Sequence, residues 1–128
     1  MKLYNVIQTR GLFASRSQQK VRPSLAYKLM KFLQATEADE QFFNQRRAEI
    51  LDEHCEKNED GTFVKVDDSH VKIKEDEIEA CNLKVKELND VEVDVSKFLF
   101  HPLELDELGF EFSIAEMYLL EDLLIKEA

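Results

Sequence analysis

The sequence is poor in residues that interrupt or cross-link a chain. Its 128 residues include three glycines, two prolines, two cysteines and no tryptophan. The three glycines stand alone, so the chain contains no Gly-rich loop of the kind that cradles phosphate. Its longest apolar runs are only a few residues, far short of the ~20 that a membrane-spanning helix needs. We therefore expect no nucleotide-binding loop and no membrane partner, and the length predicts a single domain, residues 1–128.

Metal-binding and catalytic patterns are also absent from the sequence. The only soft metal ligands are His54, Cys55, His70, Cys81 and His101, and none of them pairs at the spacing of a zinc site. A calcium-binding loop starting at position 56 would need Asp first and Glu twelfth, but those positions hold Glu and Asp. We therefore expect no cofactor, no metal and no catalytic residue, which favours a non-enzymatic protein.

Acidic residues are missing from the first 36 positions, which contain seven lysines and arginines. The other 92 residues carry ten cations and all 27 acids, a net charge of −17. This asymmetry predicts that the basic end pairs with the acidic body, within one chain or between subunits, or faces an anionic partner. Because the whole chain has a net charge of −10, direct binding to nucleic acid is not expected.

The longest stretch without Gly or Pro runs from Ser24 to Glu56 and predicts one long helix, residues 24–57. At 1.5 Å per residue this helix would be about 50 Å long, with Pro23 before it and Ser24 as its N-cap. Its apolar seam lapses at residues 36–40, where Glu and Ala still favour a helix. The chain is too small to bury such a helix entirely, so part of it must be covered by the rest of the chain or by a partner. Its first half has only short or irregular segments to cover it and is where we expect a functional contact.

The middle of the sequence predicts a β-hairpin, residues 62–73, followed by a second helix, residues 75–89. Strong β-formers alternate in the hairpin on either side of a polar turn. In the second helix, four apolar residues step by three, four and three positions, the spacing of a packed helix pair: Ile78, Cys81, Val85 and Leu88. The predicted fold is therefore α+β and mainly α, an antiparallel helical hairpin with a small β-hairpin at its tip.

The two ends of the chain are less regular. Residues 1–22 form a basic segment in which residues 2–13 fit either a short helix or a strand. Alternating valines at 91–95 predict a short strand, and residues 91–112 are expected to combine this strand with an extended apolar cover. Ser113 and Glu116 have the spacing of a capping box and predict a C-terminal helix, residues 113–127.

Candidate contact residues combine apolar surface with the charges of the basic end. They come from the basic segment, the first half of the long helix, the apolar cover and the last helix: Arg16, Arg22, Leu25, Lys28, Leu29, Lys31, Phe32, Phe98, Phe100, Leu119 and Leu123. We expect them to bind a protein partner, and the opposed charges of the two ends predict a homo-oligomer.

Several short motifs carry a resemblance that covers nearly the whole chain: MKLYN at 1–5, AYKL at 26–29, FFNQRR at 42–47, EDG at 59–61, VKI at 71–73, KEL at 86–88 and VEV at 91–93. In this combination the chain resembles a family of small uncharacterised proteins from tailed phages and prophages. The resemblance implies a phage origin and action in the bacterial host cytoplasm or in a virion, and it transfers no catalytic residue. The order helix, hairpin, helix is also similar to prefoldin-like chaperones, in topology alone.

These observations predict a non-enzymatic phage protein that acts through protein–protein contacts in virion structure or assembly. The alternative is a phage-encoded inhibitor or modulator of a host protein, such as a defence factor or a nucleic-acid enzyme. In that alternative the acidic body would mimic a phosphate backbone.

Overall fold

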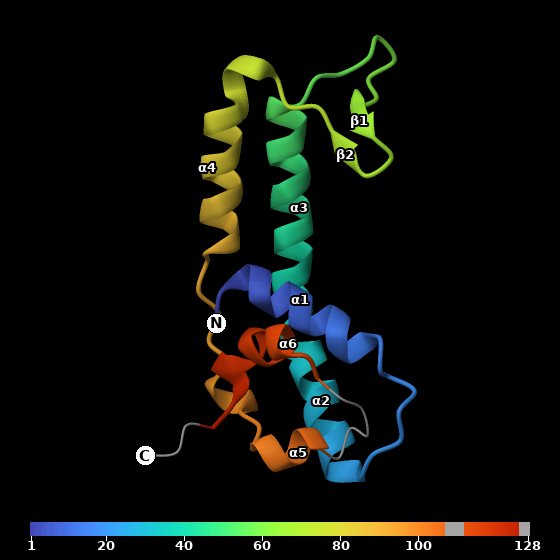
Figure 1. Ribbon diagram of the computed structural model, residues 1–128, viewed down its shortest axis with the longest axis vertical. Coiled ribbons are helices and arrows are strands. Elements are labelled where there is room, and N and C mark those ends of the chain that lie inside the picture. The colour runs from blue at the N-terminus through green and yellow to red at the C-terminus, as the bar shows by residue number, and fades with distance from the viewer. Residues whose placement is uncertain (107–111, 126–128) are drawn as a thin grey trace.

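The computed structural model describes residues 1–106 and 112–125. Figure 1 shows an elongated chain with a pair of antiparallel helices at one end and shorter helices at the other. The pair consists of α3 (Glu37–His54) and α4 (Ile78–Asn89), which pack along their lengths. A small two-stranded antiparallel sheet lies beside the tip of this helical hairpin. The predicted α+β, mainly α fold is confirmed.

The long helix predicted over residues 24–57 is two helices, α2 (Pro23–Ala35) and α3, separated at Thr36. Thr36 leaves helical geometry with φ −99° and ψ 4°, and its hydroxyl donates to the Phe32 carbonyl at 2.8 Å. Arg10, from the N-terminal part of the chain, stabilises the break. Its Nη1 donates to Thr36 Oγ1 at 2.6 Å and to the Leu33 carbonyl. The prediction of one continuous helix was wrong because residues far upstream in the sequence stabilise this interruption.

The ends of the predicted long helix also differ. Helix α2 begins at Pro23 with Arg22 as its N-cap residue, so Ser24 lies inside the first turn and is not the cap. Proline suits the first helical position because its missing N–H is not needed there. Helix α3 ends at His54, and Cys55 is already extended.

The sheet is smaller than the hairpin predicted over residues 62–73. Its strands are β1 (Lys65–Asp67) and β2 (His70–Val71), and two isolated bridges, Cys55–Ile73 and Lys57–Phe63, continue the pairing back to α3. Gly61 has φ 88°, the left-handed conformation that glycine adopts without strain, and it turns the chain between α3 and the hairpin. A 3₁₀ turn, η1 (Glu75–Glu77), then leads into α4, close to the predicted start of the second helix.

Residues 2–13 form a helix, α1 (Leu3–Ala14), which crosses the open end of the α3–α4 pair. One hydrophobic cluster joins these three helices: Leu3, Phe43, Ile50, Cys81 and Leu88. Val85 packs at its edge, as the predicted seam requires, but Ile78 is 43% exposed.

The strand predicted at residues 91–95 is an extended segment with a single bridge, between Lys2 and Glu92. The Leu3 N–H donates to the Val91 carbonyl at 2.7 Å, and the Val93 N–H donates to the Met1 carbonyl at 2.9 Å. No longer ladder forms because α1 begins at Leu3 and takes the N-terminus out of extended geometry.

The apolar cover and the last helix also differ from prediction. The cover contains a 3₁₀ turn, η2 (Ser96–Phe98), and a short helix, α5 (Pro102–Asp106); residues 107–111 of the predicted range lie outside the described residues. The predicted C-terminal helix is α6 (Ile114–Leu119) followed by a 3₁₀ turn, η3 (Glu121–Leu123). Residues 126–127 of that prediction also lie outside the described part.

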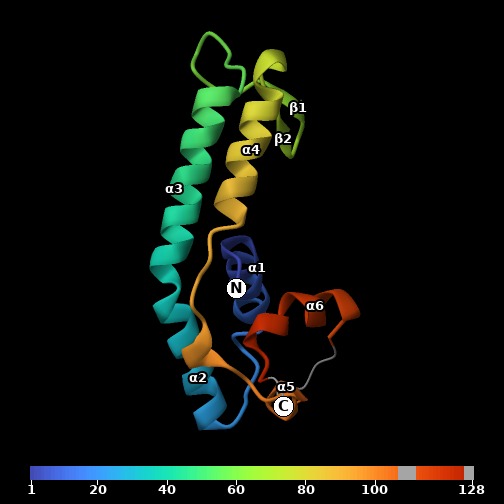
Figure 2. The ribbon, with the colours of Figure 1, turned by 90° about the vertical axis from the view of Figure 1, so that its left-hand side faces the viewer.

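A second hydrophobic cluster joins α1, α2, the cover and the C-terminal elements. Its centre is a set of edge-to-face rings, with Phe13 against Phe32 at 5.7 Å, Phe13 against Phe100 at 5.9 Å, and Phe32 against Phe98 at 5.8 Å. Such ring pairs add stability beyond the area that they bury. The segment after α4 thus returns to the N-terminal helices and closes the fold beneath the helical hairpin (Figure 2).

Candidate protein-binding surfaces

The two thiols lie inside the protein. Cys55 and Cys81 are 0% and 1% exposed, and burial raises the pKa of each thiol above its ordinary value. Both are therefore protonated at neutral pH and are weak nucleophiles. Across the described residues, the His, Cys, Asp and Glu side chains form no group of three or more that could hold a metal ion.

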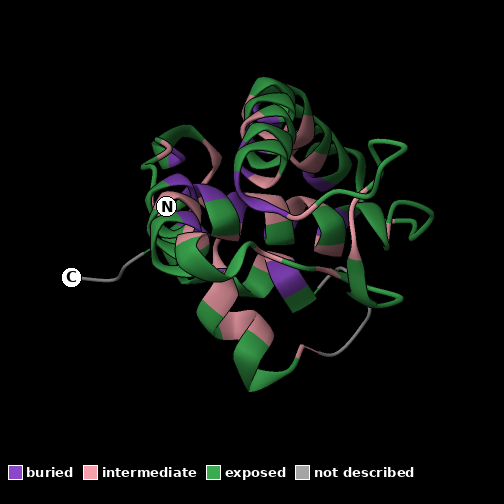
Figure 3. Cartoon of the chain, turned by 90° about the horizontal axis from the view of Figure 1, so that it is seen from above, coloured by how far each residue is buried: buried purple, intermediate pink, exposed green. Residues whose placement is uncertain are grey.

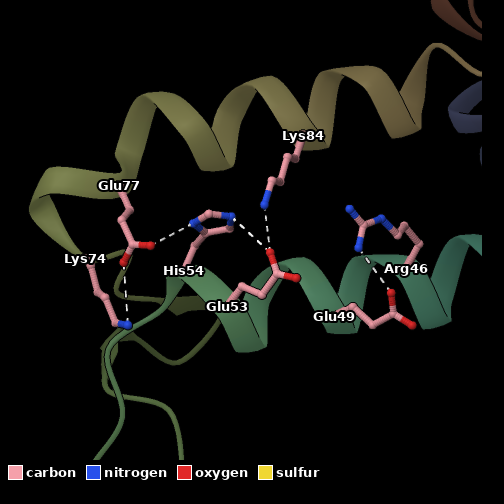
Figure 4. Close-up of polar contacts among 7 residues, drawn as sticks. All are labelled: Arg46, Glu49, Glu53, His54, Lys74, Glu77 and Lys84. Atoms are coloured by element: carbon pink, nitrogen blue, oxygen red, sulfur yellow. Dashed lines mark hydrogen bonds and ion pairs between the residues drawn. The ribbon is translucent and has the colours of Figure 1, made fainter.

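A polar cluster ties the end of α3 to the start of α4 (Figure 4). Buried His54 lies between two carboxylates, with Nδ1 3.2 Å from Glu77 Oε1 and Nε2 3.5 Å from Glu53 Oε2. Each carboxylate also meets a lysine: Lys84 Nζ is 2.7 Å from Glu53, and Lys74 Nζ is 3.5 Å from Glu77. The hydrogen bond from Lys84 is the main reason that the pKa of Glu53 is lowered. Through Glu77 and Lys84, the cluster connects the end of α3 to η1 and to α4.

The basic N-terminal end pairs with the acidic body of the same chain. Arg10 lies 2.8 Å from Glu40, Lys2 lies 3.3 Å from Asp90, and Arg16 lies 3.5 Å from Glu116 in α6. Glu104 in α5 receives two cations, Lys28 at 3.2 Å and Arg22 at 3.7 Å. Much of the charge asymmetry seen in the sequence is therefore satisfied within one chain, the first of the alternatives that it predicted.

Glu104 provides a test of these ion pairs. The His101 N–H, 2.9 Å away, and then Lys28 lower the pKa of Glu104 below its ordinary value of 4.5. The stability contributed by Glu104 is therefore complete above pH 4.5 and is lost as the pH falls through the lower folded pKa. We expect Glu104→Gln to destabilise the protein by about 1–2 kcal/mol at pH 7 and by less at pH 3.

Thermal melts of both proteins at pH 7 and pH 3 measure this difference. Glu87→Gln, at an exposed position on α4, is the matched control and should change the melting temperature at neither pH. An equal loss for Glu104→Gln at both pH values would show that the carboxylate charge does not contribute.

The structure separates the predicted contact residues into core and surface. Leu25, Phe32, Phe100 and Leu123 are at most 1% exposed. They belong to the hydrophobic cluster around the Phe rings and are core residues of this chain rather than a contact surface. The basic first half of the predicted long helix is therefore covered on that side by the chain's own C-terminal segment.

The remaining predicted residues lie at or near the surface. Leu29, Phe98 and Leu119 are half-buried, and Lys31 is exposed with its Nζ 5.3 Å from the Tyr27 ring. Arg16 packs over the Phe112 ring at 4.9 Å, and Lys28 over the Phe100 ring at 4.5 Å. Of these residues, Arg16 and Leu29 line a hollow that is also bordered by exposed apolar side chains.

That hollow is a groove between the end of α1, residues 15–22 and one face of α2. It has a volume of 270 Å³ and a mixed apolar and polar lining: Phe13, Arg16, Ser17, Gln19, Val21, Ala26, Leu29, Met30, Leu33 and Gln34. Met30 is 42% exposed and Ala26 is exposed, so part of the apolar lining is accessible to another molecule. Below, these ten residues are called the α1–α2 groove.

The second surface is one face of α6, which contains no buried residue. Ile114 and Tyr118 are four positions apart on this face and are 78% and 74% exposed. Together with Met117 in α6, Glu121 in η3 and Leu124 just after it, they line a hollow of 240 Å³. Figure 2 shows α6 standing out to one side, and in Figure 3 it projects from the rest of the chain. These five residues are called the α6 face below.

Sequence reasoning identified the last helix but not its exposed residues. A continuous helix over 113–127 predicts Leu119 and Leu123 as its contact residues. Since the α-helix ends at Leu119 and turns into η3, Leu123 rotates into the core and Ile114 and Tyr118 remain outside. Their i, i+4 spacing after the capping box was the signal that could have found them.

No helix among the described residues is long and apolar enough to cross a membrane. Comparisons with protein-family models, with curated proteins and with solved structures return no match to this chain.

Proposed function

We propose that this chain is a non-enzymatic protein of a tailed phage or prophage that acts by contacting other proteins in virion structure or assembly. The observation that carries the proposal is the α6 face. Ile114 and Tyr118 are more than 70% exposed, although half-buried and buried apolar residues surround the base of the same helix. In this proposal the protein acts in the bacterial host cytoplasm or in the virion itself.

The physical argument is that burying the exposed apolar side chains of the α6 face against a partner would stabilise a complex. Burying a large apolar side chain contributes about 1.5–3 kcal/mol. Single exposed apolar residues are common on protein surfaces, but adjoining ones around a hollow are typical of interaction sites. The capping box at Ser113 and Glu116 fixes the start of α6, so the face is presented on an ordered element.

The experiment compares wild type with a variant in which only the α6 face is changed. Ile114→Asp combined with Tyr118→Asp places charge on two exposed positions, so the fold should be retained. Each tagged protein is produced during propagation of the encoding phage, and co-purifying proteins and purified particles are examined by mass spectrometry. We expect wild type, but not the variant, to capture a virion or assembly protein that is identified by name.

Two results would overturn the proposal. The first is absence of the chain from particles and from assembly intermediates, together with no capture that depends on the α6 face. The second is capture of a host protein that is retained by the α6 variant and is lost at high salt, because this would favour the acidic inhibitor instead.

A further inference from the structure

The chain carries both a projecting apolar surface and an open apolar groove. We propose that the α6 face of one copy binds in the α1–α2 groove of a second copy. This inference deepens the proposed protein-contact function and rests on its assignment of the α6 face, and it names the partner as the chain itself. A short helix laid into an apolar groove is an established mode of protein recognition, with anchors at i and i+4.

The composition of the two surfaces fits this pairing. Ile114 and Tyr118 project from α6 as a pair on one helical face. The groove offers an apolar floor of half-buried side chains, including Leu29 and Leu33, with Met30 and Ala26 more open. Polar side chains at its edge, such as Gln19 and Gln34, can hydrogen-bond to the phenol group of Tyr118.

Charge complementarity points to a second copy rather than to an unrelated apolar segment. Residues 1–36, which form the whole groove, contain no acid, and residues 98–125, which contain the α6 face, have seven acids and no Lys or Arg. Lys20 and Lys31, both exposed, adjoin groove residues in the sequence. Glu121 and Asp122, also exposed, lie at the end of the α6 face. Docking therefore brings opposite charges together around an apolar centre.

The two segments already bind each other within one chain. Arg16 belongs to the groove and also lies 3.5 Å from Glu116 in α6, while Lys28 lies 3.2 Å from Glu104. The first contact is made to α6 and the second to α5, and neither involves Ile114 or Tyr118, which stay exposed. The same complementary chemistry is thus available for a contact between copies, through the exposed side chains of Ala26, Met30, Ile114 and Tyr118.

The proposed contact joins two different surfaces, so its symmetry can be tested. Such a pairing either closes reciprocally as a two-fold dimer or continues head to tail as a ring or chain. In both arrangements, one intact groove and one intact α6 face suffice for a single contact. Contacts between two α6 faces, by contrast, require both faces to be intact.

This difference defines the experiment. Variant one changes the groove by Ala26→Glu and Met30→Glu, and variant two changes the α6 face by Ile114→Asp and Tyr118→Asp. All four positions are exposed, so folding should be retained, which circular dichroism melts check. Sedimentation velocity over a concentration series then measures the mass of each protein alone and of an equimolar mixture.

We expect wild type to associate as its concentration rises, while each variant alone remains monomeric. The mixture should regain association, limited to dimers, because it contains one intact groove and one intact α6 face per pair. Val66→Asp is the control, since Val66 is 69% exposed at the far end of the molecule on β1, and it should associate like wild type.

Three results would overturn the inference: a monomeric wild type at every concentration, association that persists in either variant, or a mixture that stays monomeric although wild type associates. Association that persists in variant one, whose α6 face is intact, would indicate contacts between two α6 faces. If wild type is monomeric but still binds a virion protein through the α6 face, self-association is ruled out and the proposed function stands. Absence from particles with intact self-association would instead remove the proposed function in the virion.

Discussion

Replacing Phe32 by alanine should cost about 3–5 kcal/mol of folding free energy, a large share of the 5–15 kcal/mol typical of a small domain. Phe32 is 0% exposed and its ring meets Phe13 at 5.7 Å and Phe98 at 5.8 Å. Alanine would remove both ring contacts and leave a cavity between α1, α2 and η2. These elements enclose the cavity from three sides, so the site cannot close without moving a helix.

Urea denaturation followed by circular dichroism measures the loss. Phe42→Ala is the matched control, because Phe42 lies on α3 and is 52% exposed, and it should change the free energy of unfolding by less than about 0.5 kcal/mol. Similar losses for the two variants would contradict the assignment of Phe32 to the core and of Phe42 to the surface.

The helical hairpin was predictable because its signals are local. Cys81, Val85 and Leu88 recur at helix-pair spacing, and Asp60-Gly61 is a residue pair typical of turns. The capping box at Ser113 is equally local, and both of its hydrogen bonds are present. Each of these features depends on residues within one or two turns of each other, so the sequence alone determines them.

The break at Thr36 shows what local signals miss. Helix propensity favours continuation through residues 36–40, and nothing nearby opposes it. The decisive group is the Arg10 guanidinium, 26 positions upstream, which reaches the break only after α1 has packed against α3. Tertiary contacts of this kind override propensity and cannot be read from a window of sequence.

The candidate contact residues were only partly predictable, for the same reason. The C-terminal third is rich in apolar residues, as its sequence indicates. Many of them pack against α1 and α2 of the same chain, as the buried Phe100 and Leu123 show. Which apolar residues remain outside depends on where α6 ends. A single helix over 113–127 and the observed α6–η3 pair expose different residues from the same sequence.

Arg10→Met is expected to destabilise the protein by about 2–3 kcal/mol, the range for losing hydrogen bonds made by a charged group. Arg10 Nη1 donates to the Leu33 carbonyl and to Thr36 Oγ1, and Nε lies 2.8 Å from Glu40 Oε2. Methionine keeps the apolar stem but leaves the Leu33 carbonyl, at the end of α2, without this donor. The two helices would then lose the group that fixes the angle between them.

Urea denaturation measures this loss, and amide hydrogen exchange locates it. Arg47→Met, at an exposed position on α3, is the matched control and should stay within about 0.5 kcal/mol of wild type. We expect faster exchange at the last turn of α2 and the first turn of α3, with α4 unchanged, because the buried residues of α3 that pack with α4, Phe43 and Ile50, lie beyond that first turn. Unchanged exchange around Thr36 would mean that the break is intrinsic to residues 32–36, since the Thr36 hydroxyl still donates to the Phe32 carbonyl without Arg10. In that case the interruption would be a local feature after all, and Arg10 would only anchor α1 to the two helices.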